Sequence, residues 1–342
     1  MDALSIVAIG GIVLSLLFAF TNGYNDAGAD VATIVSSGAA SVKGALLTAA
    51  TSNFIGAMIG GSAVVLTLQG VLSSDVASPV GMSIFSAVAA ANLWNAITWY
   101  YGIPSSSTHA LIGGLVGVGI AFQGMPGVNW GWGDLLCGHL TGVAKVLAFL
   151  LASVILGFGG SFILMKLARL LLRRASVSVN RSMNRLQWFT TGVQTLAHGA
   201  NDAQKQMALV ALLLVAMGSP TFEVPLWVRA ACAAAMAMGT LGGGYRIMRT
   251  VGRKIFKIGP VHALVAQANS SLTVIFATFL GAPVSSTQVV TAGVMGVGTA
   301  ENHRLVHWRV GKDLIVSWFL TIPAAALLSA LMVVLLRAML EV

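Results

Sequence analysis

Two short polar motifs lie within apolar sequence, and each of them occurs twice. Residues 23–27 read Gly-Tyr-Asn-Asp-Ala, and residues 199–203 read Gly-Ala-Asn-Asp-Ala. Residues 104–109 read Pro-Ser-Ser-Ser-Thr-His, and residues 283–288 read Pro-Val-Ser-Ser-Thr-Gln. The copies are separated by 176 residues (25 to 201) and by 179 residues (104 to 283). Two unrelated motifs that repeat in the same order at nearly the same offset indicate an internal duplication.

The Ser/Thr runs are suited to an anion. Each run follows a proline and is expected to begin a helix, where free backbone N–H groups and the positive end of the helix dipole favour negative charge. Hydroxyl groups add donors without adding charge, so a bound oxyanion could be released again. The alternative is simple N-capping at the turn of a helical hairpin. The predicted substrate-binding residues are Ser106, Ser107, Thr108, Ser285, Ser286, Thr287, Asn25 and Asn201.

Ionisable residues accompany the Asn-Asp motifs in the same apolar stretches. Asp26, Asp30, Asp202 and Lys205 would each cost about 2.5–3.5 kcal/mol in a bilayer if unpaired, which implies pairing, water or a ligand. The Asn-Asp pairs are expected to unwind their helices and expose oxygen atoms that bind cations. The alternative is that they only cap a helix end.

Two histidines and a glutamine adjoin the same motifs. His109 and His198 are candidate proton carriers, because histidine changes charge near neutral pH, although each could also be a hydrogen-bonded packing residue. Lys205 could form an ion pair with Asp26 or Asp202, and Asp30 could titrate or pair with Lys205. The predicted coupling residues are Asp26, Asp30, Asp202, Lys205, Gln204, His109 and His198.

The composition places these motifs in a membrane. Of 342 residues, 57% are hydrophobic and only 8% are charged, whereas soluble domains carry about 25% charged residues. The net charge of +9 does not indicate a nucleic-acid partner, because the basic residues lie in short loops between apolar segments. Two cysteines make no disulfide framework. The chain is therefore predicted to be an all-α polytopic membrane protein in the lipid bilayer.

The apolar segments divide into complete and interrupted spans. The first segment lacks a basic flank and an evident cleavage site, so we expect it to be retained. Two apolar stretches, 103–122 and 258–299, are interrupted. The complete spans are predicted at 4–24, 44–68, 81–101, 138–168, 186–217, 227–245 and 313–338.

The distribution of lysine and arginine predicts the orientation. Basic residues without acidic neighbours place 169–185 and 246–257 in the cytoplasm, together with 300–312, whereas 69–80 and 122–136 lie outside. Both termini are then outside, and the two halves have opposite topology. The predicted organisation is an inverted repeat with each half holding a broken helix and a re-entrant hairpin: 1–175, 186–342 and a basic cytoplasmic linker at 169–185.

At these motifs the sequence resembles the inorganic phosphate transporter (PiT) family. The family pattern Gly-x-Asn-Asp-x-Ala stands at 23–28 in a varied form and again near 199–203, and the hairpin pattern Pro-x-Ser-[Ser/Thr]-Thr-[His/Gln] stands at 104–109 and 283–288. The resemblance covers the whole chain. It implies two hairpins that meet at a phosphate site, a homodimer, a bacterial inner membrane, and coupling to sodium or protons.

Two departures from the sodium-type pattern bear on the coupling ion. Ala29 and Lys205 stand where sodium-coupled relatives have asparagine, and an ammonium group would repel sodium. His198, Gln204 and Lys205 resemble the proton-coupled form of the family. Proton-coupled import of phosphate by alternating access is thus the favoured function.

Several alternatives stay open. One is a sulfate permease of the same family, and another is sodium-coupled phosphate symport. An intramembrane hydrolase is disfavoured, because its single nucleophile would not occur as duplicated runs of serine. A passive channel is the remaining transport alternative. No catalytic residue, metal site or cofactor is expected.

Overall fold

The computed structural model describes residues 3–340 except 73–79, 104 and 177, so Pro104 and most of the predicted outer loop 69–80 lie outside the described residues. The described residues form helices and no named β-strand; Leu72 and Val128 make an isolated bridge. The helices are α1 Ala3–Ser36, α2 Val42–Ile59, α3 Ala63–Gln69, α4 Val80–Tyr101, α5 Ser107–Gln123, α6 Trp132–Leu136, α7 Gly142–Leu172, α8 Val179–Ala216, α9 Leu226–Gly242, α10 Tyr245–Arg249, α11 Pro260–Phe279, α12 Ser286–Asn302 and α13 Trp308–Leu340. A π-helical turn, Thr250–Lys254, continues α10.

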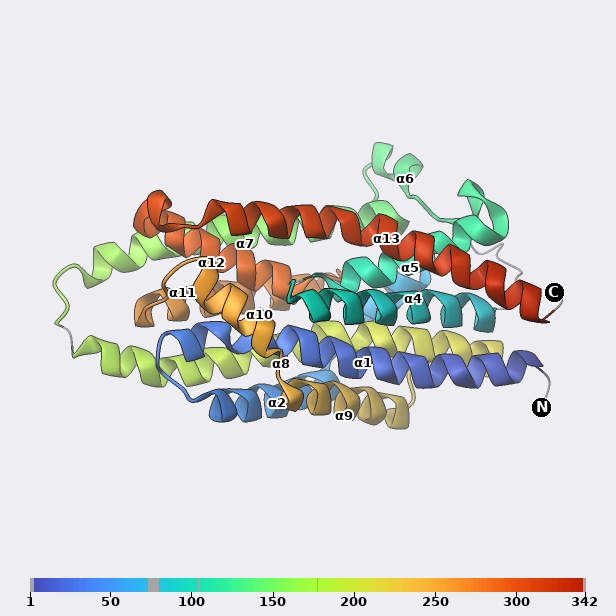
Figure 1. The fold of residues 1–342 in the computed structure, drawn as a ribbon, viewed down its shortest axis with the longest axis horizontal. Helices are drawn as coiled ribbons and strands as arrows, with labels where there is room; N and C mark the ends of the chain where they lie inside the picture. The colour runs from blue at the N-terminus through green and yellow to red at the C-terminus, as the bar shows by residue number, and fades with distance from the viewer. Residues whose placement is uncertain (1–2, 73–79, 104, 177, 341–342) are drawn as a thin grey trace.

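Most long helices have the composition of membrane spans. Among the described residues, α1, α2, α4, α7 and α13 are long and apolar enough to cross a bilayer, and the bent pair of α9 and the α10 segment makes a sixth candidate. Helix α1 begins and helix α13 ends at the same end of the bundle. This end lies opposite the connection between α7 and α8 (Figure 1). The predicted basic linker 169–185 consists largely of the end of α7 and the start of α8.

The longest helix, α8, differs from these spans because its interior is polar. It carries Gln187, Gln194, His198 and Asp202 among its buried residues, which explains why this 38-residue helix is not among the apolar candidates. It packs against α1, α2 and α11. A polar helix is stable in a membrane protein when other helices separate it from lipid.

The predicted helix breaks lie at other positions than expected. We predicted that the Asn-Asp motifs would unwind their helices, but α1 runs unbroken through Asn25 and α8 through Asn201. The breaks occur at glycine pairs instead: α2 gives way to α3 at Gly60, and α9 bends by 57° into the α10 segment at Gly243. Asn25 donates to the carbonyl group of another helix, so it does not compete for its own backbone.

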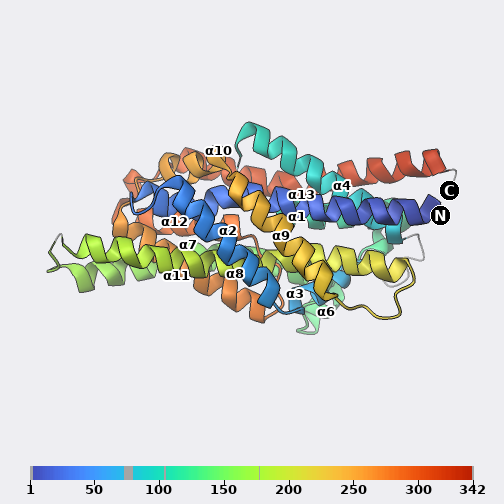
Figure 2. The same ribbon diagram turned by 90° about the horizontal axis from the view of Figure 1, so that it is seen from below.

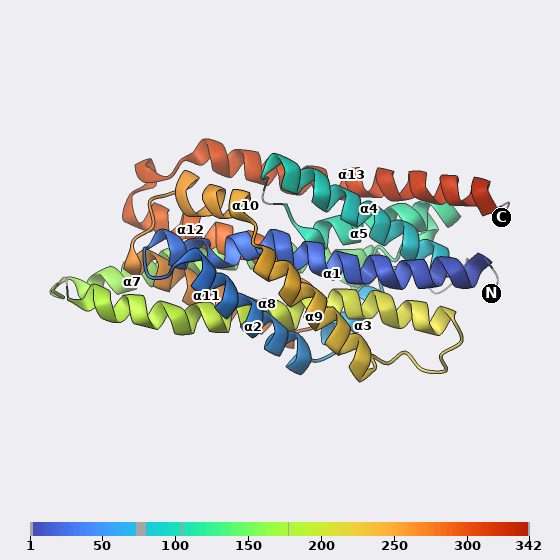
Figure 3. The ribbon, with the colours of Figure 1, turned by 60° about the horizontal axis from the view of Figure 1, so that its bottom comes forward.

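Two helix crossings have matching glycine contacts. A Cβ atom at Gly23 of α1 would collide with the Met236 carbonyl oxygen of α9, and one at Gly199 of α8 would collide with the Asn53 carbonyl oxygen of α2. Glycine permits this close backbone approach. Figures 2 and 3 show α9 lying obliquely over α1, with α2 beside it. The Asn-Asp motifs thus sit at two close helix crossings.

Two helical hairpins complete the architecture. The α4–α5 hairpin turns at Gly102 and the α11–α12 hairpin at Gly281, with φ angles of +66° and +65° that favour glycine. The turn at Gly102 accepts a hydrogen bond from Thr250, and the turn at Gly281 accepts one from Thr67. Each hairpin turn is therefore bound to a segment that follows a broken helix.

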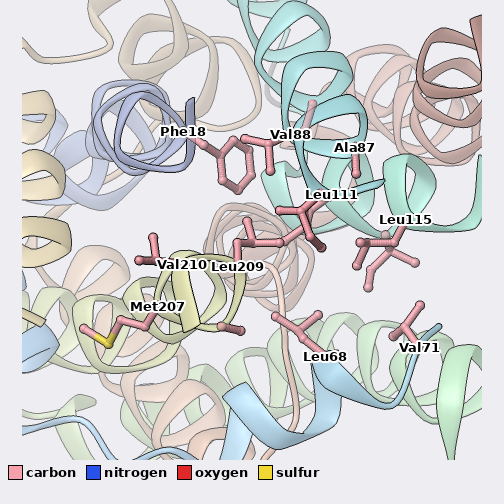
Figure 4. Packing of buried hydrophobic residues seen from close by; sticks show 14 of the residues in the cluster. Phe18, Leu68, Val71, Ala87, Val88, Leu111, Leu115, Met207, Leu209 and Val210 are labelled. Atoms are coloured by element: carbon pink, nitrogen blue, oxygen red, sulfur yellow. The ribbon is translucent and has the colours of Figure 1, made fainter. Parts of the chain in front are cut away.

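An apolar core fills the bundle on the side of the chain termini. Phe18 of α1 and Leu209 of α8 pack with Leu111 of α5 and Val88 of α4, and all four are at most 1% exposed (Figure 4). Leu213 of α8 packs against Gly11 of α1 further along the same interface. This core seals one side of the polar centre of the molecule.

The crossing of α8 with α2 provides a test of the fold. We expect Gly199→Val to lower the thermal unfolding midpoint in detergent, because the added side chain collides with backbone and overpacking typically costs about 1–3 kcal/mol. Gly192→Val is the matched control on the same helix, since its nearest neighbour, Ser52 Oγ, would lie 3.6 Å from the new Cβ atom. Equal shifts in the two variants would contradict this packing.

Candidate functional site

All sequence-predicted site residues lie in the interior of the helix bundle. They come from the middle of α1 and α8 and from the first turns of α5 and α12. Each is at most 8% exposed: Asn25, Asp26, Asp30, Ser106, Ser107, Thr108, His109, His198, Asn201, Asp202, Gln204, Lys205, Ser285, Ser286 and Thr287. The structure therefore gathers residues from four elements that are far apart in the sequence.

The second residue after each motif proline is a helix cap. The Ser106 hydroxyl accepts from the His109 backbone N–H at 3.1 Å, and the Ser285 hydroxyl accepts from that of Gln288 at 3.4 Å. Both caps have extended backbone angles, as N-cap residues do. The capping interpretation thus applies to Ser106 and Ser285, and the next residues of each run point their hydroxyl groups elsewhere.

The two threonines connect the hairpin tips to other elements. Thr108 donates to the Val284 carbonyl oxygen at 2.9 Å and so joins the start of α5 to the loop before α12. Thr287 donates to Asp26 Oδ1 at 2.5 Å and joins the start of α12 to α1. The helix starts are consequently held next to each other and next to the acidic motif.

Asn22 is a site residue that the sequence analysis missed. Ser107 donates to Asn22 Oδ1 at 2.6 Å, and Asn22 Nδ2 donates to Asp202 Oδ2 at 3.0 Å. Asn22 directly precedes the first motif, as His198 precedes the second, so the offset of 176 residues (22 to 198) could have identified it.

Ser286 and His198, which correspond to Ser107 and Asn22 in the second copy of the motifs, are not hydrogen-bonded to each other. Among the described residues, Ser286 Oγ and His198 Nε2 are buried polar atoms without a hydrogen-bond partner. They occupy the positions that correspond to Ser107 and Asn22. Buried polar groups are normally hydrogen-bonded, so Ser286 Oγ retains capacity to bind a ligand, whereas His198 Nε2 lies 3.3 Å from the Asp202 carboxylate.

Lys205 is fully buried and has three partners. Its ammonium group donates to Asp202 Oδ1 at 2.8 Å, to Thr108 Oγ1 at 2.5 Å and to the Val284 carbonyl oxygen at 2.8 Å. The expected ion pair with a motif aspartate is present, and that aspartate is Asp202. Since an ammonium group has three N–H donors, this geometry uses all of them.

His198 lies at the centre of the three carboxylates. Its Nδ1 is 2.5 Å from Asp30 Oδ2, while its Nε2 lies 3.3 Å from Asp202 Oδ2 and 3.6 Å from Asp26 Oδ2. Asp30 therefore pairs with His198, and not with Lys205. One ring thus contacts acidic groups from both α1 and α8.

Both motif asparagines contact the backbone of the hairpins. Asn25 Nδ2 donates to the Asn95 carbonyl oxygen of α4 at 3.4 Å. Asn201 Nδ2 donates to the Ala282 carbonyl oxygen at 3.0 Å, and its Oδ1 accepts from the Val284 N–H at 3.3 Å. These contacts position the hairpins. Direct contact of either residue with a substrate stays a prediction.

Gln204 and His109 also bind protein groups. Gln204 Oε1 accepts from the Val64 N–H in the first turn of α3 at 2.9 Å, so it stabilises the segment after the break in α2. His109 Nδ1 accepts from Gln288 Nε2 at 3.1 Å. His109 and Gln288 occupy corresponding positions of the two hairpins and meet each other at the interface between them.

This arrangement offers groups suited to an anion and, next to them, groups suited to a cation. The starts of α5 and α12 offer hydroxyl and backbone donors for an anion. Beside them, Asp26, His198 and Asp202 hold potential ligand atoms within 4.8 Å of one another, as a cation site requires. No metal site was expected from the sequence, and this group is the one such cluster among the described residues.

A double-variant cycle tests the buried ion pair. We expect Lys205→Met to lower the free energy of unfolding by about 3–5 kcal/mol, because it leaves the Asp202 carboxylate buried without its cation. Lys205→Met/Asp202→Asn should regain much of this loss in a thermal unfolding assay in detergent. A double variant that is no more stable than Lys205→Met would contradict the pairing.

Comparisons with known proteins agree with this geometry. Residues 22–329 match the phosphate transporter family (PHO4). A probable low-affinity inorganic phosphate transporter of Rhizobium meliloti (strain 1021) is 39% identical over 327 residues, which cover 94% of each chain. One of Bacillus subtilis (strain 168) is 36% identical over 342 residues, which cover 97% of each chain.

A solved structure has the same fold. The structure of a sodium-dependent phosphate transporter superposes with a TM-score of 0.86 at 25% identity, over 97% of this chain and 99% of that one. With its apolar spans and this match along nearly its full length, the chain belongs to the phosphate transporter family, a family of multi-pass membrane transporters and not of enzymes.

Proposed function

We propose that this protein imports inorganic phosphate together with protons by alternating access across the bacterial inner membrane. The observation that carries the proposal is the buried contact between an anion-type site and a protonatable cluster. Ser107 reaches Asp202 through Asn22, and Asp202 lies beside both His198 and Lys205. Phosphate is the substrate of the family, and the resemblance covers this chain from residue 22 to residue 329.

Phosphate binding is assigned to the first turns of α5 and α12. Ser107, Ser286 and Thr287 stand at these helix starts, where backbone N–H groups and helix dipoles favour an anion. Ser286 Oγ has no protein partner and is free to donate. Nearby carboxylates favour hydrogen phosphate over sulfate, because hydrogen phosphate can donate its proton to them.

Charge balance supports the coupling to protons. Asp26, Asp30 and Asp202 with Lys205 carry a formal charge of −2 when His198 is neutral. A negative cluster beside a phosphate site opposes anion binding unless positive charge is added. A proton on His198 supplies one such charge and is shared with carboxylates of α1 and α8. Protonation and phosphate binding are therefore expected to favour each other.

Sodium is the second candidate for the added charge. The ligand atoms of Asp26, His198 and Asp202 lie close enough together to hold a cation. The structurally similar transporter is sodium-dependent, which concerns that protein. In this chain the Lys205 ammonium lies 2.8 Å from Asp202 Oδ1 and disfavours a second cation there.

Matching contacts in the two halves support an inverted repeat of 1–175 and 186–342 joined through the basic linker 169–185. The α1–α9 and α8–α2 crossings share their glycine contacts, and Gly102 and Gly281 share their backbone angles. Two such halves could expose the central site to each face in turn. The proposal includes cytoplasmic basic segments, both termini outside, re-entrant hairpins and a homodimer within the lipid bilayer.

Uptake into proteoliposomes tests this function. We expect labelled phosphate to accumulate when the outside is acidic in sodium-free buffer, and a protonophore to abolish the accumulation. A sodium gradient at equal pH should have little effect, and excess sulfate should compete weakly. Failure of accumulation in response to either gradient would overturn symport, and accumulation driven by sodium alone would overturn proton coupling.

Replacing Lys205 tests the choice of ion. We expect Lys205→Asn to reduce proton-driven uptake about tenfold or more, equivalent to ~1.4 kcal/mol, and to introduce stimulation by sodium, because an amide oxygen replaces the repelling ammonium group. Lys205→Met is the control that lacks this oxygen and should gain no sodium response. If sodium drives the parent protein as well as protons do, this role of Lys205 is wrong.

A further inference from the structure

A row of buried polar residues continues from the site along one side of the α1–α8 interface. On α8 these residues follow helical spacing from His198 back to the start of the helix, and on α1 they follow it from Asp26 towards the C-terminal end. They are Gln187, Thr190, Thr191 and Gln194 on α8, Asp30 and Thr33 on α1 and Ser37 directly after it, with Gln267 of α11 between them; Thr190 and Ser37 are partly exposed and the others are buried. We call this set the polar row.

Hydrogen bonds connect the polar row in successive layers. Next to His198, Gln194 Nε2 donates to Asp30 Oδ1 at 3.4 Å. In the next layer, Gln267 Nε2 donates to Thr33 Oγ1 at 2.8 Å, and its Oε1 accepts from Thr190 at 2.5 Å. Each layer therefore links α8 to α1 directly or through α11.

The last layer reaches the end of the bundle. Ser37 donates to Gln187 Oε1 at 2.6 Å, and Gln187 Nε2 donates to Asn184 Oδ1 at 3.2 Å. Gln187 is fully buried, whereas Ser37 and Asn184 are partly exposed. The polar row thus extends from the fully buried His198 to the end of the bundle that carries the basic linker.

Some atoms of the polar row keep unused hydrogen-bonding capacity. Thr191 Oγ1 and Gln194 Oε1 are buried without a protein partner. Buried polar atoms of this kind are the usual partners of ordered water, which carries protons along hydrogen bonds. These two atoms lie in the layers that adjoin the His198–Asp30 pair.

The same helix pair is apolar on the opposite side of the site. With the repeat offset of 176, Thr33 and Ser37 correspond to Leu209 and Leu213, and Gln194 corresponds to Phe18. Those three residues belong to the apolar core in which Phe18 and Leu209 face each other (Figure 4). Asp30 and Thr191 correspond to the polar residues Gln206 and Ser15, so the two sides differ at Thr33, Ser37 and Gln194, and duplication of the fold does not account for the polar row at these three positions.

From this asymmetry we infer that the polar row is a proton exit pathway from the His198–Asp30 pair to the cytoplasmic face. Polar chains inside membrane proteins commonly mark proton relays. The inference rests on the proposed proton coupling and adds the route and the direction of release. The titratable groups that face His198 are Asp26 and Asp30 of α1 and Asp202 of α8, with Lys205 beyond Asp202.

The release consists of two balanced proton transfers. Protonated His198 gives its Nδ1 proton to Asp30 Oδ2, 2.5 Å away, which leaves a neutral imidazole and a neutral carboxylic acid. Asp30 then gives this proton to water among the side chains of Gln194 and Thr191, and the carboxylate is restored. No other reactant is needed, and the excess proton leaves past Gln187 and Ser37.

Variants of the polar row separate net transport from exchange. Gln194→Leu and Thr191→Val remove polar atoms without touching the predicted phosphate residues. We expect each to reduce net proton-driven phosphate uptake about tenfold or more in proteoliposomes. Exchange of labelled for unlabelled phosphate at equal pH should stay within about twofold of the parent rate, because exchange needs no net proton release. Thr195→Val is the matched control, since its hydroxyl is bonded to the carbonyl group of Thr191 in its own helix at 2.9 Å.

The outcomes separate this inference from the proposed function. A parent protein that does not respond to a pH gradient overturns proton coupling and the pathway with it. A parent that responds, with Gln194→Leu and Thr191→Val indistinguishable from Thr195→Val, overturns the pathway alone. Should Gln194→Leu lose exchange through misfolding, the isosteric Thr191→Val decides: reduced net uptake with intact exchange supports the pathway, and normal net uptake contradicts it.

Discussion

Three carboxylates are buried in the centre of the molecule, and one ammonium group and one imidazole ring are their partners. The need to pair these charges constrains the rest of the structure. Each charge would be unfavourable in hydrocarbon, so Asp26, Asp30 and Asp202 must be paired and kept away from lipid. This requirement explains why α8 is the most polar long helix and is enclosed by α1, α2 and α11. It also explains the glycines at the α1–α9 and α8–α2 crossings, because close backbone approach shields the charged segments from the bilayer.

The same charges determine where the hairpin tips lie. The Val284 carbonyl oxygen accepts from both Lys205 and Thr108, so the loop before α12 is bound to α8 and to the other hairpin at one atom. Thr287 binds Asp26 in turn. A substrate that alters the charge at the tips would therefore act on both hairpins and on both long helices. This linkage gives phosphate binding a physical means of influencing protonation some distance away.

Sequence patterns were sufficient to find the groups that meet but not how they meet. The duplicated motifs identified Ser107, Lys205 and His198, because ionisable residues and serine runs are rare in apolar spans. The continuous course of α1 through Asn25 could not be predicted, since Asn-Asp unwinds a helix only when its side chains bond to their own backbone. The offset between Asn22 and His198 was a usable signal for Asn22, whereas the contact of Gln204 with the start of α3 depends on which elements pack together, and spacing along the chain does not contain that information.

The two halves of the proposed repeat are not equivalent. The site shows where they differ: His198 stands opposite Asn22 in the proposed repeat, and Lys205 stands opposite Ala29. Both differences place an ionisable residue on α8 and a neutral residue on α1. The proposed proton pathway follows the layers of amide and hydroxyl groups on one side of the site, and the core beside Phe18 is apolar on the other. Under this proposal a duplicated scaffold would alternate between two faces while its protons leave by one.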